Sequence, residues 1–170
     1  MKKLSYLALL VLPVFIATSC KKLQTLPPEP RIEYRSFQVF DTIDILGNDA
    51  KGGKLTFYFE DGDGDVGMNP PTSELEDTSN LILTLYRKTG GVMTPAPAND
   101  PLMPSSYRIP YMEKTGQNKI LKGTIDVTFL YLFYKSTDTI MYEFYIKDRA
   151  LNESNTASTS EIILSKNNVY

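Results

Sequence analysis

The segment KLTFYFE at residues 54–60 decides the fold, because its side chains alternate between apolar and more polar types. Leu55, Phe57 and Phe59 fall on one face of an extended chain, and the residues between them fall on the other. A period of two residues is typical of a strand that covers a core with only one of its faces. The segment therefore predicts a half-buried β-strand.

Similar patterns recur along the chain, separated by turn-forming residues, and no segment shows a helical repeat. Gly52-Gly53 predicts a turn just before the central strand. The other strand-like segments are residues 32–45, 81–87, 107–111, 120–133, 139–147 and 156–164. About seven short strands in one domain predict an all-β fold, a single antiparallel β-sandwich of immunoglobulin-like, Greek-key topology. A small barrel or another Greek-key sandwich would also fit the alternation.

The N-terminus has the layout of a bacterial lipoprotein signal. Two lysines after Met1 precede an apolar run over residues 4–17, and the run leads to Ala17-Thr18-Ser19-Cys20, which contains the only cysteine of the chain. Such a run is too short to span a bilayer comfortably, and Pro13 within it argues against a membrane helix or a core helix. The resemblance to lipoprotein signals implies that residues 1–19 are cleaved and that Cys20 carries acyl chains such as palmitate, which would anchor the protein.

The organisation after the signal is simple. Residues 20–31, with the prolines of LPPEPR, predict a lipidated cysteine followed by an extended tether, and residues 32–170 predict the immunoglobulin-like domain. Without the two signal lysines the mature chain carries 16 basic residues against 20 acidic ones, so we expect no nucleic-acid partner. Its only thiol would be acylated, so disulfides would not contribute to stability.

Two motifs extend the resemblance beyond the signal. They are DGDGDVG at residues 61–67, directly after the central strand, and YIKDRALNESN at residues 145–155, before the last strand. Together with the signal they resemble a group of largely uncharacterised Bacteroidota lipoproteins. That resemblance implies an envelope protein of the sandwich class with no established activity. Lys21 and Lys22 stand where surface-exposed lipoproteins of that phylum carry acidic residues, which favours an outer-membrane position facing the periplasm, with the cell surface as the alternative.

The Asp/Gly loop, residues 61–67, is the strongest chemical pattern outside the signal. Alternate carboxylates separated by glycines can converge on a hard cation such as calcium. The loop is not an EF-hand, because Val66 stands at the sixth position, where glycine is required, and Thr72 at the twelfth, where glutamate is required. In an immunoglobulin-like topology, the loop after residue 147 would lie at the same end of the sandwich. The residues of a tentative calcium site are therefore Asp61, Asp63, Asp65, Asp148 and Asn152.

The same residues also fit two arrangements that contain no metal. Arg149 could pair with these carboxylates and hold the two loops together by charge alone. Asp and Gly are also the residues that ordinary solvated turns select, so the motif could be a turn exposed to water.

Catalysis has few candidate residues. The chain contains no histidine, its cysteine would be used by the anchor, and the acidic Asp/Gly loop would repel phosphate. We therefore expect a non-catalytic binding or scaffold module, with a carbohydrate-active enzyme using loop carboxylates as the alternative. Residues 89–117 form the longest departure from the strand pattern, and we expect them to contact a protein or glycan partner at the end opposite the Asp/Gly loop. A passive insertion is the alternative.

Overall fold

The computed structural model describes residues 26–74, 77–104, 107–114 and 119–170, and every regular element among them is a β-strand. The predicted signal peptide, Cys20 and the first half of the predicted tether, up to residue 25, lie outside the described residues. The strands are β1 (Arg31–Ile43), β2 (Asp49–Asp61), β3 (Leu81–Thr89), β4 (Val92–Pro95), β5 (Leu121–Tyr131), β6 (Thr139–Ile146), β7 (Ala157–Ser158), β8 (Ile162–Ile163) and β9 (Asn168–Val169).

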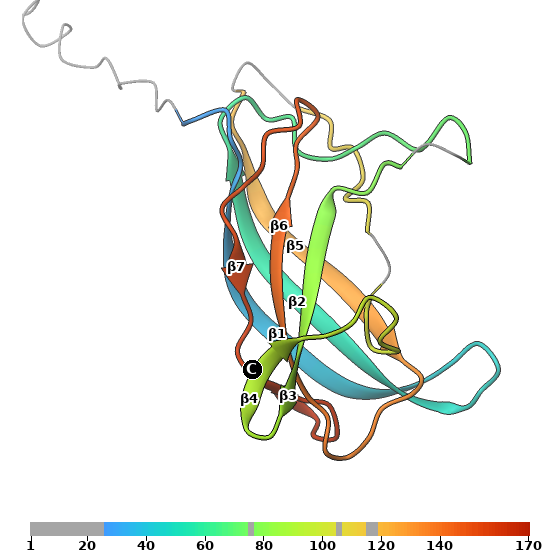
Figure 1. Ribbon diagram of the computed structural model, residues 1–170. Helices are drawn as coiled ribbons and strands as arrows, with labels where there is room; N and C mark the ends of the chain where they lie inside the picture. Colours follow the sequence, from blue (N-terminus) through green and yellow to red (C-terminus); the bar gives the residue numbers. More distant parts are fainter. Residues whose placement is uncertain (1–25, 75–76, 105–106, 115–118) are drawn as a thin grey trace, which may run out of the picture.

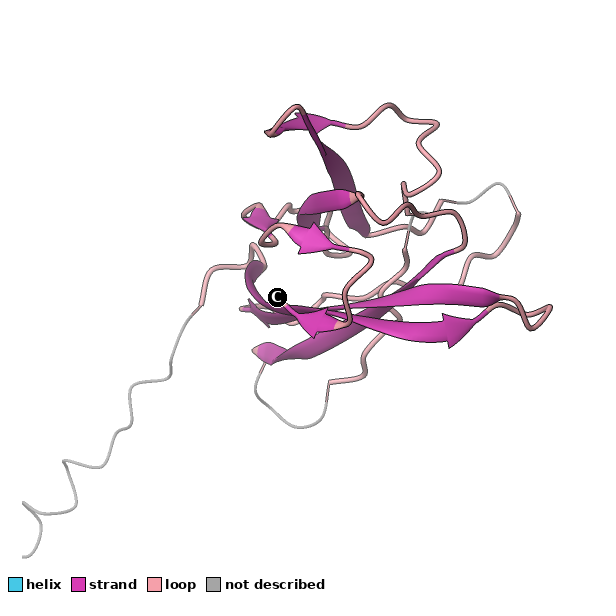
Figure 2. Ribbon diagram, turned by 90° about the horizontal axis from the view of Figure 1, so that it is seen from below, coloured by secondary structure: helices cyan, strands magenta, loops and turns pink. Residues whose placement is uncertain are grey.

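These strands form two antiparallel sheets packed face to face, which Figure 2 shows as two layers. One sheet has the order β5-β2-β1-β9, and the other has the order β4-β3-β6-β7, with β8 also pairing with β6. The chain crosses between the sheets after β2, after β4 and after β5, as immunoglobulin-like sandwiches do, and crosses once more after β8, so that β9 joins the edge of the first sheet beside β1. The predicted all-β sandwich is therefore confirmed. The segment 156–164, expected as one strand, is divided into β7 and β8.

The core consists of the inward faces of these strands. Every second residue of β6 is buried, and on β2 Leu55 and Phe57 have no exposed surface. Aromatic rings from the two sheets meet in the middle, for example Phe57 and Phe144 with centroids 5.3 Å apart. Burial of each side chain of this size stabilises the folded state by roughly 1.5–3 kcal/mol. The apolar residues that alternate along the sequence are therefore the ones that hold the two sheets together.

The turn predicted at Gly52-Gly53 is wrong, because both glycines lie inside β2. A Cβ atom on Gly53 would lie 2.5 Å from the ring of Phe37 and 2.8 Å from the ring of Tyr131. Glycine therefore makes room for two core aromatic rings inside a strand. The sequence also predicts a turn at Gly47-Asn48-Asp49, and the β1–β2 hairpin does turn there: Gly47 has a φ of +85°, and the carboxylate of Asp44 accepts hydrogen bonds from the backbone N–H groups of Leu46 and Asn48.

The Pro-rich passage after β4 is folded onto the core. Leu102 is buried, its carbonyl accepts a hydrogen bond from the Tyr142 hydroxyl at 3.3 Å, and Asp100 pairs with Arg87 at 2.9 Å. The chain then runs back towards the Asp/Gly loop, where Tyr111 donates its backbone N–H to the Met68 carbonyl. The expectation that residues 89–117 lie at the end opposite the Asp/Gly loop therefore holds only for their first part.

Candidate metal centre

Two loops meet at the end of the sandwich where β2 ends and β1 begins (Figure 1). The β2–β3 loop, residues 62–80, follows Asp61, and the β6–β7 loop, residues 147–156, follows Ile146. An isolated bridge joins Val66 of the first loop to Asp148 of the second. Val66 has no exposed surface, so the residue that breaks the EF-hand pattern is an apolar anchor between the two loops.

Four aspartates converge where the loops meet, and we call them the carboxylate cluster. The cluster consists of Asp61, Asp63, Asp65 and Asp148, each offering one oxygen, and these oxygens all lie within 4.8 Å of one another. Asp61 is only 1% exposed and Asp148 has no exposed surface. The Oδ1 atoms of Asp61, Asp63 and Asp65 are buried and have no hydrogen-bond partner. Buried carboxylate oxygens are costly without partners, so this arrangement calls for a positive charge or a proton.

The local backbone explains why the loop brings its carboxylates inward. Asp61 Oδ2 accepts hydrogen bonds from the backbone N–H groups of Asp65 at 2.7 Å and Val66 at 3.1 Å. Gly64 has a φ of +68°, a conformation that favours glycine and lets the chain reverse between Asp63 and Asp65. The Asp/Gly loop therefore closes around the side chain of its own first residue.

The position of Asn152 differs from the one expected for a ligand. Its backbone N–H donates to Asp148 Oδ1 and its side-chain amide donates to Asp148 Oδ2, both at 2.8 Å. Asn152 therefore orients Asp148, which is the residue of this loop that belongs to the cluster. The expected strand order identified both residues, but only the structure shows their different roles.

The electrostatics of the cluster reflect its burial. Burial raises the pKa of Asp61 to about 6, against the effect of its backbone hydrogen bonds and with further increases from the charges of Asp63 and Asp65. Burial and then the neighbouring charge of Asp148 raise the pKa of Asp65 as well. Two carboxylates at 4.8 Å repel each other by roughly 1–3.5 kcal/mol for effective dielectric constants between 80 and 20. Full ionisation is therefore unfavourable unless a cation binds.

Arg149 lies close enough for its charge to lower the pKa of Asp65, against the larger effect of burial, but its guanidinium is bonded elsewhere. Its guanidinium donates to the Gly67 carbonyl at 2.9 Å and stacks on the ring of Tyr111, with 4.9 Å between the guanidinium carbon and the ring centroid. The ion pairs among the described residues include none between Arg149 and the cluster. The burial of Asp61 and Asp148 also differs from what a solvated turn would show.

Lys114 is a neighbour of the loop that the sequence did not reveal. It reaches back from the segment after β4 and donates a hydrogen bond from its ammonium group to the backbone carbonyl of Asp63. No spacing or motif pointed to it, because 51 residues separate the two. This contact uses the backbone carbonyl of Asp63 and not its carboxylate.

The donor set is made only of carboxylate oxygens, so the cluster could hold a metal ion, and a hard one. Zinc sites, by contrast, usually contain histidine or cysteine.

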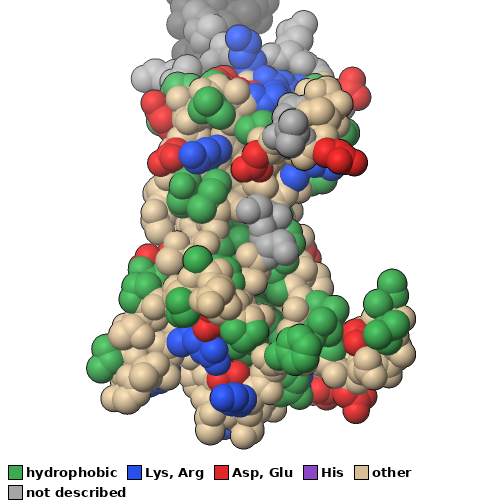
Figure 3. All heavy atoms as spheres, turned by 45° about the vertical axis from the view of Figure 1, so that its right-hand side comes forward, with side chains coloured by type: hydrophobic (Ala, Val, Ile, Leu, Met, Phe, Trp, Pro, Cys, Tyr) green, Lys and Arg blue, Asp and Glu red, His purple; other side chains and the backbone are tan. Residues whose placement is uncertain are grey.

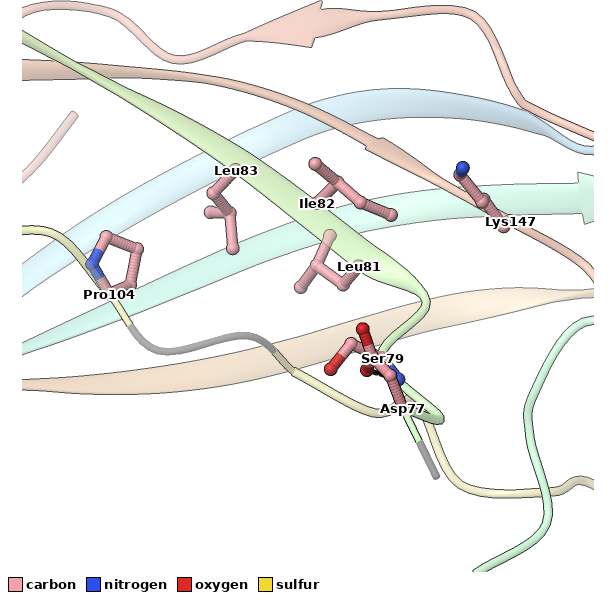
Figure 4. Close-up of a pocket in the computed structure, with 7 residues that line it drawn as sticks. All are labelled: Asp77, Ser79, Leu81, Ile82, Leu83, Pro104 and Lys147. Atoms are coloured by element: carbon pink, nitrogen blue, oxygen red, sulfur yellow. Dashed lines mark hydrogen bonds between the residues drawn. The ribbon is translucent and has the colours of Figure 1, made fainter. Parts of the chain in front are cut away.

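Among the cavities on the described surface are two that lie away from the cluster. One of about 220 Å³ lies beside β3, and Figure 4 shows Asp77 and Ser79 together at one end of it and Pro104 at the other. The Asp77 carboxylate accepts a hydrogen bond from the backbone N–H of Ser79, so it is used in a local turn. A second, of about 410 Å³, lies between residues 107–112 and β5 and is mainly apolar. The carboxylate cluster belongs to neither.

Comparisons of the chain with models of protein families, with curated proteins and with solved structures find no match. In the part of the chain that the structure describes, no helix is long and apolar enough to cross a membrane.

Proposed function

We propose that this protein is a lipid-anchored, non-catalytic binding or scaffold module of the bacterial cell envelope, stabilised at its N-terminal end by a bound calcium ion. The observation that carries the calcium site is the convergence of three buried, unpartnered carboxylate oxygens on Asp61, Asp63 and Asp65 with the buried Asp148. A divalent cation would satisfy these oxygens and cancel their mutual repulsion.

Calcium suits the cluster better than magnesium does. Calcium accepts six to eight oxygen ligands in flexible geometry, whereas magnesium requires a near-ideal octahedron and usually keeps several waters. The four aspartates offer one oxygen each from two loops, and a flexible calcium site can complete its coordination with further oxygens such as water. In this proposal the four aspartates are ligands and Asn152 holds Asp148 in place.

The cation site is tested by thermal unfolding of the purified full-length protein during calcium titration. We expect the melting temperature to rise with calcium, by an amount that corresponds to roughly 2.7 kcal/mol at one hundred times Kd. Asp63→Ala should lose this rise, whereas Asp49→Ala, at an exposed position in the β1–β2 hairpin, should keep it. An unchanged melting temperature of the native protein at millimolar calcium would refute the site.

The lipid anchor and the envelope location rest on the sequence around Cys20. The described chain enters the sandwich at the end that holds the cluster, so the opposite end would face away from the membrane (Figure 1). We place the protein on the outer membrane facing the periplasm, with the cell surface as the alternative. Labelled palmitate should be incorporated into the native protein and not into Cys20→Ala; equal labelling would contradict the anchor. Protease treatment of intact cells then distinguishes the two faces.

Exposed apolar residues at the far end support the binding role. Ile45 of the β1–β2 hairpin is 100% exposed, Phe133 after β5 is 74% exposed, and Val92 of the β3–β4 hairpin is 63% exposed. Figure 3 shows hydrophobic side chains gathered around this end of the molecule. Within residues 89–117, the β3–β4 hairpin is the part best placed for the proposed protein or glycan partner. On a glycan array, binding without turnover supports this role; turnover that Asp61→Asn abolishes would favour the carbohydrate-active alternative.

A further inference from the structure

The chain that precedes β1 packs directly on the Asp/Gly loop. Gly62 donates its backbone N–H to the carbonyl of Pro27 at 3.0 Å. A Cβ atom on Gly62 would lie 2.2 Å from that carbonyl oxygen and 2.3 Å from the carbonyl oxygen of Leu26. The contact is therefore backbone against backbone, and only glycine leaves room for it. Pro30, the last residue before β1, is buried and completes the docked segment.

The β6–β7 loop holds the start of β1, directly after the docked segment. Asn155 accepts a hydrogen bond from the Ile32 N–H at 2.9 Å and donates one to the Ile32 carbonyl at 3.0 Å. The two loops that carry the carboxylate cluster therefore hold adjacent stretches of the chain, the Asp/Gly loop at Pro27 and the β6–β7 loop at Ile32. Gly62 lies between two cluster residues, Asp61 and Asp63, so its position follows theirs.

We propose that cation binding at the carboxylate cluster fixes the docking of residues 26–30, and so sets the direction in which the chain leaves the sandwich towards its membrane anchor. Without a cation, repulsion between the carboxylates favours opening of the Asp/Gly loop and displaces Gly62 from Pro27. With a cation, Asp61 and Asp63 are held and Gly62 is held between them. Whether a cation is bound would thereby determine how the domain is oriented relative to its tether. This inference rests on the proposed cation site and lipid anchor.

Hydrogen exchange of the full-length lipidated protein in detergent micelles tests the inference, with mass spectrometry as the readout. The informative amides are those of Gly62 and Ile32, whose acceptors lie on Pro27 and Asn155. Calcium at ten times its Kd, compared with chelator, should slow their exchange by about tenfold. Calorimetric titration with calcium is run on the same preparation.

The outcomes separate the two proposals. Absence of calcium binding in the calorimeter overturns both of them. Calcium binding with unchanged exchange at Gly62 and Ile32 overturns the docking inference alone. Slowed exchange at both amides supports it.

Two variants separate docking from cation binding. Asn155→Ala removes the hydrogen bonds to Ile32 and leaves the four carboxylates in place, so it should still bind calcium, with an affinity lowered by at most the same tenfold coupling, while exchange at Ile32 becomes fast and insensitive to calcium. Gly62→Ala retains all four aspartates but loses the contact with Pro27, so calcium should still bind, and more weakly than in the native protein. Gly123→Ala is the matched control, because its Cβ would meet only a ring atom of Phe59 at 3.5 Å. If calcium slows exchange at Ile32 equally in Asn155→Ala and the native protein, the fastening has no role and the inference falls.

Discussion

Replacing Asp61 by asparagine should stabilise the cation-free protein at neutral pH while removing most of its response to calcium. Burial raises the pKa of Asp61 from 3.8 to about 6, so the folded state holds this proton more tightly than the unfolded state does. The stability that the protonated side chain contributes is fully present below pH 3.8 and is lost as the pH rises through about 6. Asparagine keeps an oxygen for the N–H groups of Asp65 and Val66 but carries no charge.

The size of the effect follows from the two pKa values. Their separation corresponds to about 3 kcal/mol at 1.36 kcal/mol per pH unit. Asp61 itself is 1% exposed, but Asp63 and Asp65 are only partly buried, so solvent screening reduces the expected gain to about 1–2 kcal/mol. For a domain of this size, that gain corresponds to a rise of roughly 3–8 °C in melting temperature.

The assay is thermal unfolding followed by circular dichroism between pH 4 and pH 7.5, in chelator and in millimolar calcium. In chelator, the melting temperature of the native protein should fall relative to that of Asp61→Asn as the pH rises through about 6. Calcium should raise the melting temperature of the native protein and leave that of Asp61→Asn nearly unchanged. Asp49→Asn removes an exposed carboxylate outside the cluster and should follow the native curve. The reasoning would be refuted if the melting temperatures of the native protein and Asp61→Asn changed in parallel with pH, or if calcium raised both by the same amount.

Two further predictions concern stability away from the cluster. Arg87 bridges Asp100 at 2.9 Å and Asp138 at 2.5 Å, and both aspartates are less than 10% exposed, so Arg87→Met should lower the free energy of unfolding in urea by about 2–4 kcal/mol. Lys88→Ala, which breaks a largely solvent-exposed pair, should cost less than about 1 kcal/mol, and equal costs would contradict the role of burial. Leu151 has a φ of +67° and is 70% exposed, so Leu151→Asn should raise stability by about 0.5–1 kcal/mol in the same assay. A loss of stability there would show that the leucine side chain makes a compensating contact.

The sequence predicted the class of fold because the information is local. Alternation in segments such as KLTFYFE records which side of a strand faces the core, and this requires no knowledge of distant residues. The glycines in β2 were misinterpreted for the complementary reason. Gly53 makes room for Phe37 and Tyr131, which lie on neighbouring strands, and a local pattern cannot distinguish that role from a turn.

For the candidate site, too, the sequence showed one part and the tertiary structure another. The sequence by itself determined the alternating aspartates of the Asp/Gly loop, and the expected order of strands indicated that Asp148 and Asn152 would approach them. Only the tertiary structure decided that three of the aspartate oxygens are buried without partners, that Asn152 holds Asp148, and that Gly62 carries the incoming chain. The physical reason is that burial and hydrogen-bond partnership depend on atoms brought together across many residues of chain, whereas spacing records only what neighbours along the chain can do.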